Sequence, residues 1–187
     1  MAAIKDESRK GNMTPVSPNE LKVGMGPVAH PNVRLFILGS LPGDASLAAH
    51  RYYAHPTNQF WRLLGRVLGE ELHLLTYEDR LRRLAERQVG LWDVVESAER
   101  RGSLDQAIRS AGYNRLDRLL TEFPDLRAIA FNGLTAAQLG RRALGPTQLT
   151  LIDLPSSSAA NTRRFDQKAE VWDQLALYAG PKTLPRA

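Results

Sequence analysis

The sequence predicts an α/β fold, a three-layer α/β/α sandwich around a central four-stranded, mainly parallel sheet. Two observations support this prediction. Four short apolar runs recur along the 187-residue chain, and segments with the apolar spacing of helices separate them. Strands that alternate with helices require right-handed crossovers, and these crossovers place helices on both faces of a parallel sheet.

The first apolar run, residues 34–39, is nearly continuous, which is typical of a strand covered on both faces. We therefore expect it to be central and parallel to its neighbours. Similar runs at residues 89–92, 127–131 and 148–152 predict the other three strands.

Helical periodicity fills the segments between these runs. Thr76 followed by Asp79 predicts a helix N-cap, and Ser103 with Gln106 has the spacing of a capping box. The first helical face comprises Phe60, Leu64, Val67 and Leu68.

Three further helices are expected in the second half of the chain. An apolar stripe between residues 116 and 123 ends at Pro124, since proline disfavours helix in the residue before it. The remaining helices are expected over residues 134–144 and 166–178.

Residues 1–30 are polar and contain several prolines, so they cannot bury enough apolar surface to offset chain entropy. We expect a flexible N-terminal arm over residues 1–30 and a single domain over residues 31–187. The N-terminus lacks the apolar core of a secretion signal, and no apolar run approaches the roughly 20 residues of a membrane span. A cytoplasmic location, without a membrane partner, is the resulting expectation.

The composition excludes several kinds of chemistry. Cysteine is absent, which removes disulfides, thiolate nucleophiles and thiolate metal sites. His50 and His55 are too isolated to predict a metal site. The 25 Lys and Arg residues outnumber the 20 Asp and Glu residues, and most are arginines, which bind phosphate and stack on flat rings. This charge fits a polyanionic partner, although solvated helix faces give the same balance.

Ligands of open parallel sheets bind outside the carboxyl ends of the strands. This rule selects four polar or turn-prone loops, at residues 39–44, 93–96, 132–135 and 153–161. The first loop is neither a dinucleotide-binding nor a phosphate-binding motif, and the serines of the last loop lack a nucleophile elbow. Residues 51–62 combine aromatic, amide and arginine side chains, which suits unpaired bases. Within that segment we expect Phe60 and Trp61 to lie in the core.

Several motifs together point to a known family. Gly39-Ser40-Leu41-Pro42-Gly43 is followed by the segment 53–61, YAHPTNQFW, and further matches lie at residues 90–95, 102–105, 131–133 and 154–158. This ordered set, over about residues 27 to 178, resembles the uracil-DNA glycosylase superfamily. The similarity is greatest to the mismatch-specific uracil-DNA glycosylases and the related hypoxanthine-DNA glycosylases.

The resemblance implies a catalytic domain that hydrolyses the N-glycosidic bond of uracil in G:U mismatches, leaving an abasic site without any cofactor. Hypoxanthine is the rival base, and other damaged bases are further substrates to test. The implied partner is double-stranded DNA, with single-stranded DNA as a second substrate, and we expect a nucleoid-associated monomer. Such an enzyme must flip the base out of the duplex.

The resemblance also implies roles for individual residues. Tyr53 would stack on the base and Asn58 would face its polar edge, although Asn58 also suits a helix cap. The implied base-binding residues are Gly39, Ser40, Leu41, Pro42, Tyr53 and Asn58. The implied DNA-binding residues are Pro155, Ser156, Ser157, Ser158, Ala159, Asn161, Arg163 and Arg164.

Two departures from the family pattern shape the catalytic hypothesis. Leu41 stands where the family often has Asp or Asn, and Leu154 where it often has His. Because a carboxylate stabilises an oxocarbenium-like sugar, we predict that Asp93 is the catalytic residue, with Asp44 as the runner-up. The alternative role of Asp93 is to cap the following turn. Asp153 and Glu96 are weaker candidates.

Two alternatives concern the reaction itself. The missing side chains leave open a non-catalytic module that binds damaged DNA. A bifunctional glycosylase needs an amine for a Schiff base, but Lys168 is the only lysine between residues 23 and 181, so simple hydrolysis is preferred.

Overall fold

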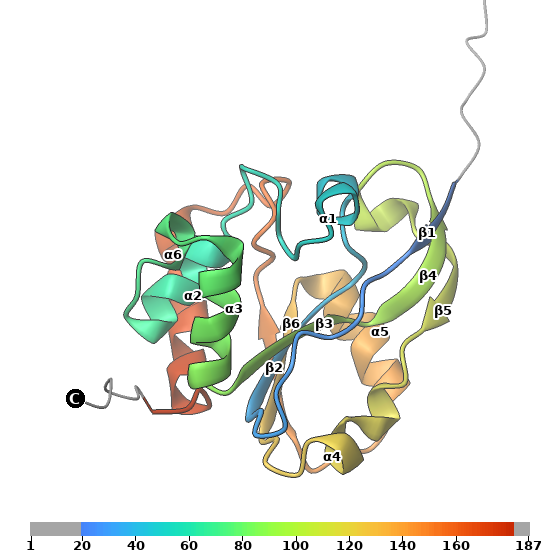
Figure 1. Ribbon diagram of the computed structural model, residues 1–187. Coiled ribbons are helices and arrows are strands. Elements are labelled where there is room, and N and C mark those ends of the chain that lie inside the picture. Colours follow the sequence, from blue (N-terminus) through green and yellow to red (C-terminus); the bar gives the residue numbers. More distant parts are fainter. Residues whose placement is uncertain (1–19, 182–187) are drawn as a thin grey trace, which may run out of the picture.

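A computed structural model describes residues 20–181 (Figure 1). Its central sheet has the strand order β3-β2-β6-β7, and all neighbouring strands are parallel. The strands are β2 (Leu35–Gly39), β3 (Val89–Asp93), β6 (Ala128–Asn132) and β7 (Thr150–Leu154). The predicted α/β fold with a four-stranded parallel sheet is confirmed.

Helices cover both faces of this sheet, as Figure 1 shows. On one face lie α2 (Phe60–Leu68), α3 (Tyr77–Glu86) and α6 (Phe165–Trp172), and on the other α4 (Leu119–Glu122) and α5 (Leu134–Leu144). In β2, Leu35 and Ile37 pack toward the first group, whereas Phe36 and Leu38 pack toward the second. Each of these side chains is fully buried, and such burial stabilises the folded state by about 1.5–3 kcal/mol per side chain. The alternation explains why this strand is apolar throughout.

Shorter helices complete the described part of the chain. They are α1 (Asp44–Ala49) and four 3₁₀ helices, η1 (Leu72–Leu74), η2 (Asp105–Ala107), η3 (Leu116–Arg118) and η4 (Asp173–Leu177). The N-cap at Thr76 is confirmed, because its side chain accepts a hydrogen bond from the Asp79 amide at 3.2 Å. None of the helices within residues 20–181 has the length and apolar character to span a membrane.

A second, antiparallel sheet was not predicted. It consists of β1 (Glu20–Val23), β4 (Val95–Arg100) and β5 (Arg109–Tyr113), in the order β1-β4-β5. The predicted capping box is wrong, because the Ser103 hydroxyl instead accepts a hydrogen bond from the Asp44 amide at 2.9 Å. The strand pattern of β4 is hidden because one of its buried positions is Arg100.

The predicted flexible arm does not extend to residue 30. β1 pairs with β4, and Val28 forms a bridge with Leu91 in which both backbone N–H groups donate. Residues 1–19 of the predicted arm lie outside the described residues. The sequence gives no local signal for β1, since its partner strand is far along the chain.

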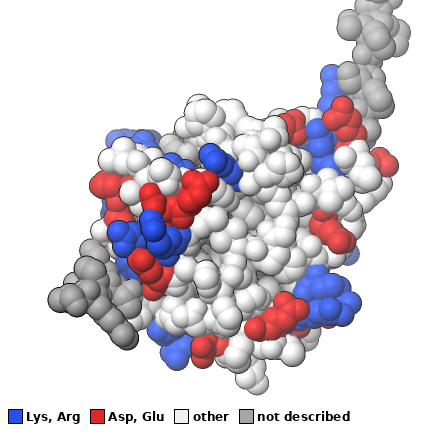
Figure 2. Space-filling view, viewed as in Figure 1, with Lys and Arg blue, Asp and Glu red and all other residues white. Residues whose placement is uncertain are grey.

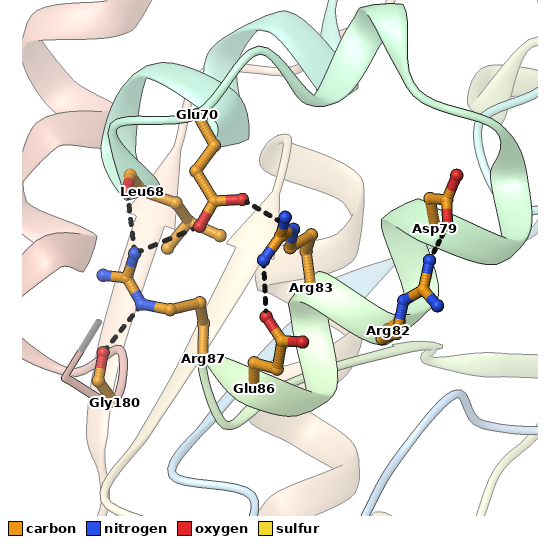
Figure 3. Close-up of polar contacts among 8 residues, drawn as sticks. All are labelled: Leu68, Glu70, Asp79, Arg82, Arg83, Glu86, Arg87 and Gly180. Atoms are coloured by element: carbon orange, nitrogen blue, oxygen red, sulfur yellow. Dashed lines mark hydrogen bonds and ion pairs between the residues drawn. The ribbon is translucent and has the colours of Figure 1, made fainter. Parts of the chain in front are cut away.

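Charged side chains of both signs intermix over α3, while the centre of the same face is largely uncharged (Figure 2). Figure 3 shows how these charges pair. Arg87 donates to the carbonyls of Leu68 at 2.7 Å and Gly180 at 2.9 Å, and Glu70 lies between Arg87 and Arg83 at 3.6 and 3.4 Å. The network joins the end of α2, α3 and the last described residues.

Candidate active site

The carboxyl ends of the four parallel strands open into one cleft of about 990 Å³. All four loops selected from the sequence contribute residues to it, and residues 103–106, between β4 and β5, form a further wall. Its volume is at the upper end of the usual range for small-molecule pockets.

Asp93 lies in the wall of this cleft, at the end of β3 and directly opposite Gly39 of β2. Its side chain is 3% exposed, and its Oδ2 atom is buried without a hydrogen-bond partner among residues 20–181. A Cβ atom at position 39 would collide with the other carboxylate oxygen. The glycine therefore makes room for the carboxylate.

Burial raises the pKa of Asp93 to about 7, and the nearby charge of Asp105 acts in the same direction. The Tyr52 hydroxyl and the Arg100 guanidinium oppose this shift without cancelling it. A carboxyl group with such a pKa changes protonation state near neutral pH, which is a common property of catalytic acids and bases.

Tyr53 brings a second buried polar group beside Asp93. Its ring stacks on Phe60, with centroids 3.6 Å apart and planes 7° from parallel. Its hydroxyl is buried without a partner in the described part of the chain, and burial followed by the Asp93 charge raises its pKa. The backbone φ of Tyr53 is +55°, an uncommon conformation that costs about 1 kcal/mol or more. The structure thus holds one face of the ring against the core.

The Ser40 hydroxyl donates a hydrogen bond of 2.6 Å to Asp105, which the sequence analysis placed in a motif but gave no role. Burial raises the pKa of Asp105, whereas the Ser40 hydrogen bond and the charge of Arg100 lower it. Asp105 reaches the cleft from η2, in the connection between β4 and β5 of the second sheet, which was not predicted. Its position could therefore not be inferred from the four strand-end loops.

Arg100 holds the backbone of the first loop. Its guanidinium is fully buried and donates to the carbonyls of Leu41, at 3.1 Å, and Pro42. Desolvation lowers the pKa of Arg100, while the charges of Asp44, Asp105 and Asp93 oppose this. Arginine remains charged in proteins, so the site contains a buried positive charge behind its carboxylates.

The last loop is fixed to β6 by a reciprocal pair. The Asn132 side chain donates to the Ser157 hydroxyl and accepts from the Ser157 amide, both at 2.8 Å. Ser157 is fully buried, so its hydroxyl faces Asn132. Gly133 has a φ of +110°, which favours glycine, and a Cβ there would lie 3.1 Å from Ser156.

Lys168 of α6 lies beneath this loop with 1% exposure. Its ammonium donates to the Gln59 side chain and to the carbonyls of Ser158 and Asn161, at 3.0, 3.3 and 2.9 Å. Desolvation lowers the pKa of Lys168, and the charge of Arg163 adds to the effect. The lysine thus sets the shape of residues 158–161.

The structure brings almost all predicted ligand-contacting residues to one cleft. Every member of the predicted base-binding set lies in the cleft wall, namely Gly39, Ser40, Leu41, Pro42, Tyr53 and Asn58. The DNA-binding set lines it through Pro155, Ser156, Ser157, Ser158, Ala159, Asn161 and Arg163, whereas Arg164 is exposed outside it. Asn58 also accepts a hydrogen bond from the Phe60 amide at 3.0 Å. The expected burial of Phe60 and Trp61 is confirmed.

The other candidate carboxylates differ from Asp93 in their surroundings. Asp44 lies on the cleft wall with its side chain 47% exposed, 3.1 Å from the Lys22 ammonium. Asp153 is 2.9 Å from Arg141, and Glu96 is exposed. Asp93 is therefore the most buried of the four. No group of three potential metal ligands occurs within residues 20–181.

Comparisons with known proteins agree with this fold and cleft. The family model of the uracil DNA glycosylase superfamily matches residues 27–176. A solution NMR structure of a candidate uracil DNA glycosylase from Methanosarcina acetivorans superposes with a TM-score of 0.75 at 37% identity, covering 84% of this chain and 97% of that chain.

Two proteins named hypoxanthine DNA glycosylase are similar in sequence. The one from Methanosarcina barkeri is 39% identical over 153 residues, which is 81% of this chain and 95% of that protein. The one from Methanosarcina acetivorans is 39% identical over 155 residues, which is 83% of this chain and 98% of that protein.

The parallel sheet and its strand-end cleft define an α/β protein of the DNA glycosylase class. The chain belongs to the uracil DNA glycosylase superfamily.

Proposed function

We propose that the protein is a monofunctional DNA glycosylase that hydrolyses the N-glycosidic bond of a deaminated base, acting as a monomer on double-stranded DNA. Hypoxanthine is the first candidate base, supported by the names of the two relatives. Uracil opposite guanine, the base predicted from the sequence, is the second, supported by the description of the NMR structure. The location at the nucleoid in the cytoplasm stays a prediction.

The observation that carries the proposal is the buried carboxylate of Asp93 in the wall of the cleft, whose Oδ2 atom has no hydrogen-bond partner within residues 20–181. Cleavage of the bond builds positive charge on the sugar, and a carboxylate in a poorly solvated site stabilises that charge strongly. With a pKa of about 7, Asp93 can also polarise the attacking water at neutral pH. As the glycosidic bond breaks, water adds to the sugar carbon and loses one proton, and the departing base takes up one proton, so the hydrolysis releases no net proton.

Simple hydrolysis is supported by the contacts of Lys22 and Lys168, the lysines within residues 20–181. The Lys168 ammonium donates three hydrogen bonds, and Lys22 pairs with Glu20 at 2.8 Å and Asp44 at 3.1 Å. Neither amine is placed as a free nucleophile for a Schiff base.

The first experiment measures base release from duplexes that contain hypoxanthine opposite thymine or uracil opposite guanine. Abasic sites are cleaved with alkali and counted against a no-enzyme control. We expect multiple turnovers by the native chain and a loss of about 100-fold or more in Asp93→Asn with DNA binding retained. Binding without release from any deaminated or alkylated base would instead identify a recognition module.

The pH dependence gives a second test. The ionised form of Asp93 is the active one, so the release rate should rise as pH increases through about 7 and then level off. A single-turnover rate profile from pH 5.5 to 9 measures this directly. A flat profile, or high activity of Asp93→Asn together with inactivity of Asp44→Asn, would transfer the role away from Asp93.

A further inference from the structure

The hydrogen bond between Ser40 and Asp105 links two distant segments at the cleft. Ser40 follows β2, Asp105 begins η2 between β4 and β5, and both line the cavity. The Oγ to Oδ1 distance is 2.6 Å, which is typical of a hydroxyl that donates to a carboxylate. Ser40 is 7% exposed, so its hydroxyl has few other partners.

The chemistry of this pair fixes the direction of its proton. An ionised carboxylate has no hydrogen and only accepts, whereas a hydroxyl has one hydrogen and two lone pairs. Burial raises the pKa of Asp105, but the Ser40 hydrogen bond and the Arg100 guanidinium act in the opposite direction. The distance of 2.6 Å is that of a hydroxyl donating to an ionised carboxylate. The Ser40 hydrogen is therefore directed to Asp105, which leaves its lone pairs for a donor in the cleft.

We propose, on the basis of the glycosylase function above, that Asp105 is a specificity-determining positioning residue: it makes Ser40 an obligate hydrogen-bond acceptor for the ring N–H of a deaminated base. Hypoxanthine and uracil carry a hydrogen on the ring nitrogen beside the new carbonyl. In adenine and cytosine the same nitrogen is an acceptor, so it would face the Ser40 lone pairs without a hydrogen between them. Such unmatched buried polar groups give strong discrimination.

Binding to uncleaved duplexes tests this inference. Probes contain 2′-fluoro-2′-deoxyinosine or 2′-fluoro-2′-deoxyadenosine opposite thymine, because the fluorine slows cleavage. We expect the native chain to prefer the inosine duplex by about tenfold or more, and Asp105→Ala, whose Ser40 hydroxyl rotates freely, to reduce this preference to about threefold or less.

A double-mutant cycle separates positioning from general structure. Ser40→Ala should lower hypoxanthine release about tenfold, and adding Asp105→Ala to it should cost little more, since Asp105 acts through Ser40. Asp117→Ala is the matched control, because this carboxylate is about half exposed and pairs with Arg115 at 2.7 Å. The control should retain both the rate and the preference.

The outcomes distinguish the two proposals. If the native chain releases no base, the proposed function fails first. If it releases hypoxanthine but both Ser40→Ala and Asp105→Ala retain the preference for inosine, the Asp105 inference alone is overturned. Additive losses in the double variant would also overturn it, because they would show that the two residues act separately. Since Ser40→Ala removes one hydroxyl, it keeps the test valid should Asp105→Ala fold poorly.

Discussion

Charged groups are arranged in opposite ways in two regions of the molecule. Between α2 and α3, Glu70, Arg83 and Arg87 pair with one another or with backbone carbonyls (Figure 3). In the cleft, the Asp93 Oδ2 atom and the Tyr53 hydroxyl are buried without such partners in the described structure. A buried polar group without a partner destabilises the fold. Because proteins are only marginally stable, such groups are typical of positions where a ligand or a reaction uses them. Glu70, Arg83 and Arg87 thus contribute to the stability of the fold, whereas Asp93 and Tyr53 keep buried polar atoms available to a ligand in the cleft.

The largest expected effect is a gain in stability when the cleft loses its charge. Because the pKa of Asp93 in the folded chain, about 7, exceeds its ordinary value of 3.8, the fold binds the proton more tightly, and ionisation destabilises it as pH rises from 4 to 7. Asp93→Asn should raise the free energy of unfolding at pH 8 by up to about 4 kcal/mol, and much less at pH 4.5. Urea denaturation at both pH values measures this. A lower free energy of unfolding for Asp93→Asn than for the native chain at pH 8 would show that ionised Asp93 does not destabilise the fold.

The next effect is a loss of stability when the paired region is broken. Arg87→Met leaves the carbonyls of Leu68 and Gly180 without their side-chain donor and leaves Glu70 paired with Arg83 alone, which should cost about 3 kcal/mol. Base release by the folded variant should be unchanged. Arg82→Met is the matched control, since the Arg82 side chain is 68% exposed and its ion pair within residues 20–181 is with Asp79, worth about 0.5 kcal/mol. Equal unfolding midpoints for the two variants would show that the network adds no stability.

A smaller effect is expected from displacing the unpaired carboxylate without removing it. Gly39→Ala places a Cβ against Asp93 and within 3.3 Å of the Tyr53 hydroxyl, so the release rate should fall about 100-fold, or about 2.7 kcal/mol. Gly26→Ala, where a Cβ meets nothing within 4 Å, is the control for single-turnover kinetics. Native activity in Gly39→Ala would show that the carboxylate position is unimportant.

The parallel sheet was predictable because each strand carries its own signal. Residues such as Phe36 and Ile37 face opposite helical layers, so the apolar run is continuous and local. The position of the cleft was predictable because ligands of open parallel sheets bind at the carboxyl ends of the strands. The loops that line it directly follow the apolar runs of these strands.

The second sheet was not predictable, because its signals are spread over distant segments. β1 pairs with β4 far along the chain, and β4 buries Arg100 where a strand pattern calls for an apolar residue. Asp93 was therefore predictable from the sequence, whereas the roles of Arg100 and Asp105 were not. The motif at residues 102–105 was the available signal for Asp105.

Lys168 determines which substitutions the loop at residues 158–161 can accept without losing its shape. Of the three oxygens that its ammonium binds, one belongs to the Gln59 side chain before α2, and two are the backbone carbonyls of Ser158 and Asn161. The loop shape is then largely independent of the loop side chains, which we propose to contact DNA. New side chains at Ala159 or Ala160 should alter strand or lesion preference while the scaffold stays intact, which makes this loop the natural place to engineer new repair specificities.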